Sequence, residues 1–204
     1  MTTLPRPTTL PVWTALGAWG VAALAVSALG VITIERRAVI PIVLASAVAA
    51  LLAGYRLWPS LRALAQRIDL RAPILLHTIR APIGVMFLVM EARGELDGSF
   101  AQLAGWGDIA AGLLAIGAAL AVGSELPSRR TIILLWNALG LLDILAVVAN
   151  AQRILLFSDH PDTMRALTQF PFGILPLFVV PIVIATHVLV FARARREASE
   201  AARS

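Results

Sequence analysis

Long apolar runs, separated by short polar links, account for most of the chain. Six of these runs have about the 20 residues that an α-helix needs to cross the hydrocarbon core of a bilayer. They cover residues 12–34, 38–57, 73–91, 100–122, 131–151 and 170–192. The hydrophobic pattern therefore predicts an all-α fold, a polytopic membrane helix bundle with about six transmembrane helices.

The link between the second and third runs, PSLRALAQRIDLR, has a different pattern. At helical spacing, its apolar and polar side chains fall on opposite faces. The apolar face holds Leu61, Leu64, Ala65 and Ile68, and the polar face holds Arg62, Gln66, Arg67 and Asp69. This link is expected to form a short interfacial amphipathic helix between helices two and three, with a partner-docking helix as the alternative.

The composition agrees with a membrane protein and removes several kinds of chemistry. Hydrophobic residues make up 59% of the chain and charged residues 14%, whereas soluble domains have about 25% charged residues. All 17 basic residues are arginines, so no lysine is available for a retinal Schiff base. The chain also has no cysteine, which excludes disulfides, thiolate metal sites and thiol nucleophiles.

The arginines are unevenly distributed between the two sides of the predicted bundle. Eleven fall in the N-terminal segment, the 56–72 link, the turn before residue 131 and the tail, and five fall on the other side. The positive-inside rule then predicts cytoplasmic termini and residence in the cytoplasmic (inner) membrane, without any need for nucleic-acid binding. The expected organisation is a cytoplasmic N-terminal segment at 1–11, a single transmembrane bundle at 12–192 and a cytoplasmic tail at 193–204.

The third apolar run carries charged groups that hydrocarbon penalises. His77, Arg80, Gly84 and Glu91 fall on one stripe of a continuous helix. An arginine at the bilayer centre costs about 2.5 to 3.5 kcal/mol on insertion scales. Arg80 is therefore expected to have an acidic or carbonyl partner on another helix.

Two aspartates in later runs are candidates for that partner. At a rise of about 1.5 Å per residue, Asp108 and Asp143 reach nearly the same depth, within reach of the Arg80 side chain. Small residues beside each acid allow close helix approach, and the predicted helix-packing glycines are Gly84, Gly105, Gly112 and Gly140. We expect Arg80 to pair with one aspartate and the other to exchange a proton near neutral pH. The predicted ion or solute site comprises Arg80, Asp108, Asp143, Asn137 and Glu91, and the alternative is a buried ion pair that fixes helix register.

Two histidines define a second layer of the predicted bundle. His77 and His187 lie at similar depths from the same face, so their rings are expected to approach each other. Facing imidazoles are candidate haem b or metal ligands, whereas interfacial side chains bonded to carbonyls would show the same spacing. In the same run as His187, Pro171, Pro176 and Pro181 predict a kinked helix whose freed carbonyls line a cavity.

The functional hypotheses follow from these candidate sites. The chain has no HExxH, GxSxG or P-loop motif, so we expect no catalytic residues and no enzymatic activity. The first hypothesis is a small transporter or conductor of protons or a small polar solute, without a cofactor. The alternatives are a bis-His haem b or metal-binding protein and an accessory subunit of a membrane complex. The expected partners are the lipid bilayer and either a second copy of the chain or a membrane complex.

Overall fold

The computed structural model describes residues 9–201, and within this range the chain forms helices and no β-strand. The α-helices are α1 (Leu10–Ala28), α2 (Val39–Leu57), α3 (Pro59–Arg67), α4 (Arg71–Leu76), α5 (Arg80–Ala92), α6 (Gly98–Ala121), α7 (Arg129–Phe157) and α8 (Val180–Ala201). Short 3-10 segments are η1 (Ile34–Arg36), η2 (His77–Ile79) and η3 (Pro161–Thr168), and η4 (Leu175–Val179) is a π-helical turn.

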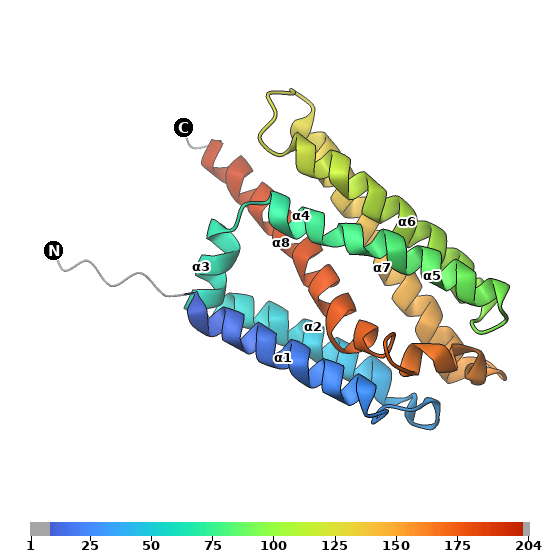
Figure 1. Ribbon diagram of the computed structural model, residues 1–204. Coiled ribbons are helices and arrows are strands. Elements are labelled where there is room, and N and C mark those ends of the chain that lie inside the picture. The colour runs from blue at the N-terminus through green and yellow to red at the C-terminus, as the bar shows by residue number, and fades with distance from the viewer. Residues whose placement is uncertain (1–8, 202–204) are drawn as a thin grey trace.

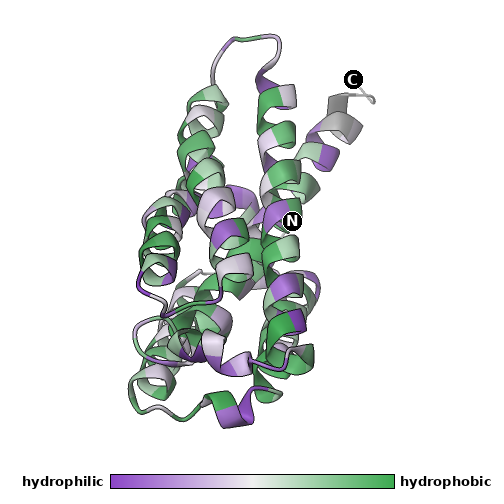
Figure 2. Ribbon diagram, turned by 90° about the vertical axis from the view of Figure 1, so that its right-hand side faces the viewer, coloured by the Kyte–Doolittle hydropathy of each residue, from purple (hydrophilic) through white to green (hydrophobic). Residues whose placement is uncertain are grey.

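Six segments are long and apolar enough to cross a membrane, which confirms the predicted fold class. By length and composition they are Leu10–Ala28, Val39–Leu57, Arg71–Ala92, Gly98–Ala121, Arg129–Phe157 and Leu175–Glu197. Figure 2 shows hydrophobic residues along most of each long helix and hydrophilic residues concentrated toward loops and helix ends. The short helix predicted between the second and third spans is also present, as α3.

The spans form two groups that are joined by a crossing helix. The α1–α2 hairpin lies on one side and α4 to α7 lie on the other, with α8 running diagonally between them (Figure 1). Helix α8 contacts α2 on one side and α7 on the other. The described chain begins and ends on the side where α3 lies, as an even number of spans requires.

Several predicted boundaries differ from the structure. The first helix ends at Ala28 instead of continuing to residue 34, because Gly30 adopts a φ of +62°, which a helix cannot accommodate. The predicted tail at 193–204 is not separate from its span, since α8 continues to Ala201. Residues 1–8 of the predicted N-terminal segment and residues 202–204 of the tail lie outside the described residues.

The third span is not the continuous helix that the stripe argument assumes. A 3-10 turn at His77–Ile79 separates α4 from α5. Pro82 explains this break, because it has no amide hydrogen to donate to the carbonyl of Thr78 and its ring disfavours a regular α-turn there. The turn presents His77 and Arg80 at the junction of the two helices.

The sixth span begins later than predicted. Pro171 lies in the turns before the helix, whereas Pro176 lies in the π-turn and Pro181 in the first turn of α8. The predicted irregularity is therefore at the start of the span. Leu175, Pro176 and Val179 of this irregular turn line an internal cavity.

Helices α5 and α6 pack closely because small residues meet along their contact. A β-carbon at Gly112 would lie 2.7 Å from the backbone nitrogen of Ala81, and one at Gly105 would lie 2.6 Å from Leu88. A β-carbon at Gly84 would overlap the carbonyl oxygen of Gly105. The neighbouring backbone leaves no room for a side chain at Gly84 and Gly112, and the Leu88 side chain occupies that space at Gly105.

Candidate functional site

Arg80 lies at the centre of a buried cluster of charges contributed by three helices. Its Nε donates to Asp108 Oδ1 on α6 at 2.6 Å, and its Nη2 donates to Asp143 Oδ2 on α7. A third bond runs from Nη1 to the carbonyl oxygen of Gly140 at 3.3 Å. Arg80 is 2% exposed and Asp108 is 5% exposed, so both are removed from solvent and lipid.

The expectation that one aspartate would be left unpaired is wrong. Both carboxylates accept hydrogen bonds from the same guanidinium group, because its planar fork presents donors in two directions. The fully ionised cluster has two negative charges and one positive charge. The unbalanced charge therefore belongs to the whole cluster and not to a single unpaired residue.

Gly107 makes room for Asp143 and was not among the predicted site residues. A β-carbon at this position would overlap the Asp143 carboxylate. The carboxylate thus occupies the space that a side chain on α6 would take. The only available signal was its place in Gly105-Trp106-Gly107, directly before Asp108.

The two histidines meet on the other side of Gly140. His77 and His187 are both fully buried, and their ring centroids are 4.2 Å apart with the planes tilted by 50°. Trp136 packs against both rings, at centroid distances of 5.1 Å from His77 and 5.5 Å from His187. The rings approach each other as their matched depths led us to expect.

Hydrogen bonds assign a tautomer to each ring. Nδ1 of His187 lies 2.9 Å from the side-chain oxygen of Asn137, so this nitrogen is the donor. Nε2 of His77 lies 3.0 Å from the hydroxyl of Thr186. Because that hydroxyl donates its own hydrogen to the carbonyls of Ile182 and Val183, Nε2 of His77 is also a donor. Within the described residues, the remaining nitrogens, His77 Nδ1 and His187 Nε2, have no hydrogen-bond partner.

The geometry of this histidine pair does not fit a haem. A porphyrin held by two axial imidazoles must lie between them, whereas these rings are in direct contact. The backbone of Gly140 also closes the unpartnered edge of His187, since a β-carbon there would lie 3.1 Å from Nε2. Among residues 9–201, no group of three or more histidine, aspartate or glutamate side chains is arranged to hold a metal ion.

The other two residues of the predicted ion or solute site, Asn137 and Glu91, have hydrogen-bond partners other than Arg80. The Asn137 amide donates to the carbonyl of His187 at 3.0 Å, so Asn137 serves the histidine pair and not Arg80. Glu91 lies near the far end of α5, where it accepts a hydrogen bond from Gln102. Residues on one stripe of a helix point the same way but can lie at different depths in the bilayer. Glu91 is about 16 Å further along α5 than Arg80. Glu91 is therefore not part of the charge cluster.

Two further residues of the histidine layer were not among the predicted site residues. Thr186 precedes His187 and bonds to His77, and Trp136 precedes Asn137 and donates to the carbonyl of Ala111 at 3.0 Å. Each is adjacent in sequence to a predicted residue. A polar neighbour of a polar residue within a span was the available signal.

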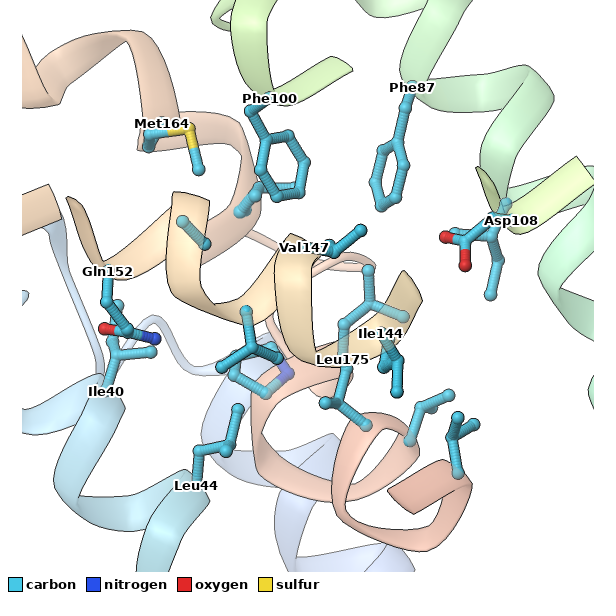
Figure 3. Close-up of a pocket in the computed structure, with 18 of the residues that line it drawn as sticks. Ile40, Leu44, Phe87, Phe100, Asp108, Ile144, Val147, Gln152, Met164 and Leu175 are labelled. Carbon is cyan, nitrogen blue, oxygen red and sulfur yellow. The ribbon is translucent and has the colours of Figure 1, made fainter. Parts of the chain in front are cut away.

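A cavity of about 90 Å³ leads away from the charge cluster toward the end of the bundle opposite α3. Arg80 and Asp108 contribute its charged lining, and most other walls are apolar. Figure 3 places Asp108 at one end of the cavity and Met164 and Gln152 toward the other. The cluster is thus reached from one side by a narrow apolar cavity and is closed on the other side by the histidine layer.

Comparisons with known proteins give a family and no relative of known activity. No curated protein and no solved structure matches the chain. A family model matches residues 37–195, which is more than half of the chain and includes Arg80, both aspartates and both histidines. The chain therefore belongs to the family described as Domain of unknown function (DUF8737).

Proposed function

We propose that this membrane protein exchanges protons at the Asp108–Arg80–Asp143 cluster and moves them across the membrane. The observation that carries the proposal is the sharing of one buried guanidinium group by two carboxylates. A net charge in a low-dielectric interior is costly. One proton shared between the two carboxylates makes the cluster neutral, so the cluster is a natural one-proton site.

The size of the adjoining cavity favours protons over a larger solute. Sites for drug-sized molecules usually have volumes of about 300 to 1,000 Å³. The cavity beside Asp108 has about 90 Å³, which is room for a few water molecules. A stable buried water needs polar partners, and the cavity offers Arg80 and Asp108 at one end and Gln152 toward the other.

The proposal gives the protein an orientation in the membrane and no enzymatic reaction. The arginine distribution supports the cytoplasmic membrane, with both termini in the cytoplasm. The cavity then opens toward the outer side and the histidine layer lies toward the cytoplasm. No observation favours the haem alternative or the accessory-subunit alternative over proton exchange.

The test measures proton flux through purified protein in liposomes that contain a pH-sensitive dye. Asp108→Asn and Asp143→Asn each leave Arg80 with one carboxylate, so each cluster has no excess charge for a proton to neutralise. Both variants are expected to fold and to lose most of the flux. Glu95→Gln, an exposed change outside the cluster, is the control and should retain it.

Two outcomes contradict the proposal. The first is wild-type flux no higher than that of empty liposomes. The second is full flux from both folded asparagine variants. In either case, the cluster acts as a buried ion network that fixes helix register.

A further inference from the structure

The strongest site outside the charge cluster is a groove at the arginine-rich end of the bundle, defined by Arg67, Arg71, Arg129, Arg130 and Arg193. The groove has a volume of about 450 Å³ and lies between the α3–α4 link, the α6–α7 turn and α8. These elements meet on the side of the molecule where α3 lies (Figure 1). Arg67, Arg129, Arg130 and Arg193 line it directly, and Arg71 lies against Gly123 at its edge.

Backbone carbonyls hold several of these arginines in place. Arg193 Nη1 donates to the carbonyl of Ile68 at 2.6 Å, and Arg130 Nη2 donates to that of Ala194 at 3.1 Å. Arg71 donates to the carbonyl of Val122 through two nitrogens. These bonds fix the guanidinium groups and use only part of the five N–H donors that each possesses.

The positive charge of the groove is not balanced locally. Asp69 and Glu197 are the acids among its lining residues, so four arginines face two carboxylates. Among the side chains that the structure describes, no carboxylate lies within ion-pair distance of any of these four arginines. Arginine forks that are held in place and have free donors match the oxygens of a phosphate group.

The walls of the groove indicate a lipid as the source of that phosphate. Leu70, Ile133, Leu134 and Val190 are among its lining residues, and Val190 is buried in the apolar cluster that includes Trp136, with Leu70 and Ile133 packed against that cluster. The groove therefore has a cationic mouth at the end of the spans and an apolar floor between them. We propose that it binds the phosphate headgroup of an anionic glycerophospholipid, with the acyl chains running along the adjacent helices. This inference does not depend on proton exchange at Arg80.

The experiment compares lipid-dependent stabilisation of the full-length protein in detergent. Phosphatidylglycerol is expected to raise Tm and to remain bound in native mass spectra, whereas phosphatidylcholine with the same acyl chains is not. Arg67→Gln combined with Arg129→Gln removes two charges from exposed side chains, so folding should be unaffected. We expect this variant to bind phosphatidylglycerol about 30-fold more weakly.

The matched control is Arg36→Gln combined with Arg93→Gln, two exposed arginines at the other end of the bundle. It should bind phosphatidylglycerol like the wild type. If the control lost as much phosphatidylglycerol binding as the groove variant, the proposal would be overturned, because binding would then depend on the total charge of the protein. Equal stabilisation by phosphatidylcholine, or by inorganic phosphate alone, would overturn the assignment to an anionic lipid.

Discussion

The side chain of Arg80 connects three helices through different nitrogens of one planar group. Its Nε and Nη2 atoms reach Asp108 and Asp143, and Nη1 reaches the backbone of α7 at Gly140. A lysine has a single terminal nitrogen and lacks this rigid fork. The chemistry of arginine therefore determines how closely α5, α6 and α7 converge at this level.

Replacement of Arg80 by glutamine is predicted to destabilise the protein strongly. It leaves two carboxylates close together without a counter-charge, and removal of one partner from a buried ion network typically costs about 3 to 5 kcal/mol. The yield of folded protein and Tm, followed by tryptophan fluorescence, should both fall. Arg93→Gln, at the exposed C-terminal end of α5, should change neither.

A triple variant separates charge imbalance from loss of packing. Arg80→Gln combined with Asp108→Asn and Asp143→Asn makes the whole cluster neutral, and a neutral cluster of similar volume is often as stable as the ionic one. Tm should therefore recover substantially relative to Arg80→Gln alone. A triple variant no more stable than the single one would show that charge imbalance is not the cause.

Depth arithmetic predicted the level of these residues but not their pairing. Residue count along a span gives height in the bilayer, which is why Arg80, Asp108 and Asp143 were expected together. Which carboxylate Arg80 meets depends on how α6 and α7 are rotated about their axes. Gly107 and Gly140 set that rotation through contacts made only in the packed bundle.

Among the helices, α5 and α6 depend most clearly on small residues. Gly112 faces the backbone of α5 at Ala81, whereas Gly117, five residues later on α6, has nothing within 4 Å of its β-carbon position. The two glycines share a helix and differ in what surrounds them. They therefore allow helix propensity and helix packing to be measured separately.

Gly112→Ala is predicted to destabilise the protein and Gly117→Ala is not. The new methyl group at position 112 would lie 2.9 Å from the β-carbon of Ala81, and overpacking of this kind costs about 1 to 3 kcal/mol. At position 117, alanine should be neutral or stabilise by up to about 1 kcal/mol. Thermal unfolding of the two variants in the same detergent tests this, and equal Tm values would contradict it.

Hydrophobic run length identified every span and could not locate the irregular turns. The break at His77–Ile79 arises from Pro82, five residues after its start, in a run that is apolar enough to be predicted as one continuous helix. The π-turn at Leu175–Val179 has a similar origin, because Pro181 has no amide hydrogen to donate to the carbonyl of Leu177. Proline in a span predicts a disturbance, but neighbouring helices decide its form.

Over the whole molecule, the even number of spans and the arginine distribution underlie the proposed orientation. The described chain starts and finishes on the side of α3, where the arginine-rich groove also lies. The turn between α5 and α6 lies at the opposite end. From the positive-inside rule we propose that the first side faces the cytoplasm and the second faces outward.

Reporter fusions test this orientation. A phosphatase that is active only outside the cytoplasm should be active when fused after Gly98, at the start of α6, and inactive when fused after Ser204. A cytoplasm-dependent fluorescent reporter at the same positions is the control and should give the reverse pattern. Phosphatase activity at Ser204 and none at Gly98 would refute the orientation.

The distance in sequence between Arg80 and its partners has a consequence for synthesis at the ribosome. Asp108 follows Arg80 by 28 residues and Asp143 follows it by 63. At about 5 to 20 residues per second, roughly 3 to 13 seconds pass between translation of Arg80 and translation of Asp143. Arg80 is therefore synthesised before either of its carboxylate partners. Until α6 and α7 are in place, Arg80 lacks the partners that it has in the folded bundle, so we expect membrane integration of its span to depend on translation of the helices that follow.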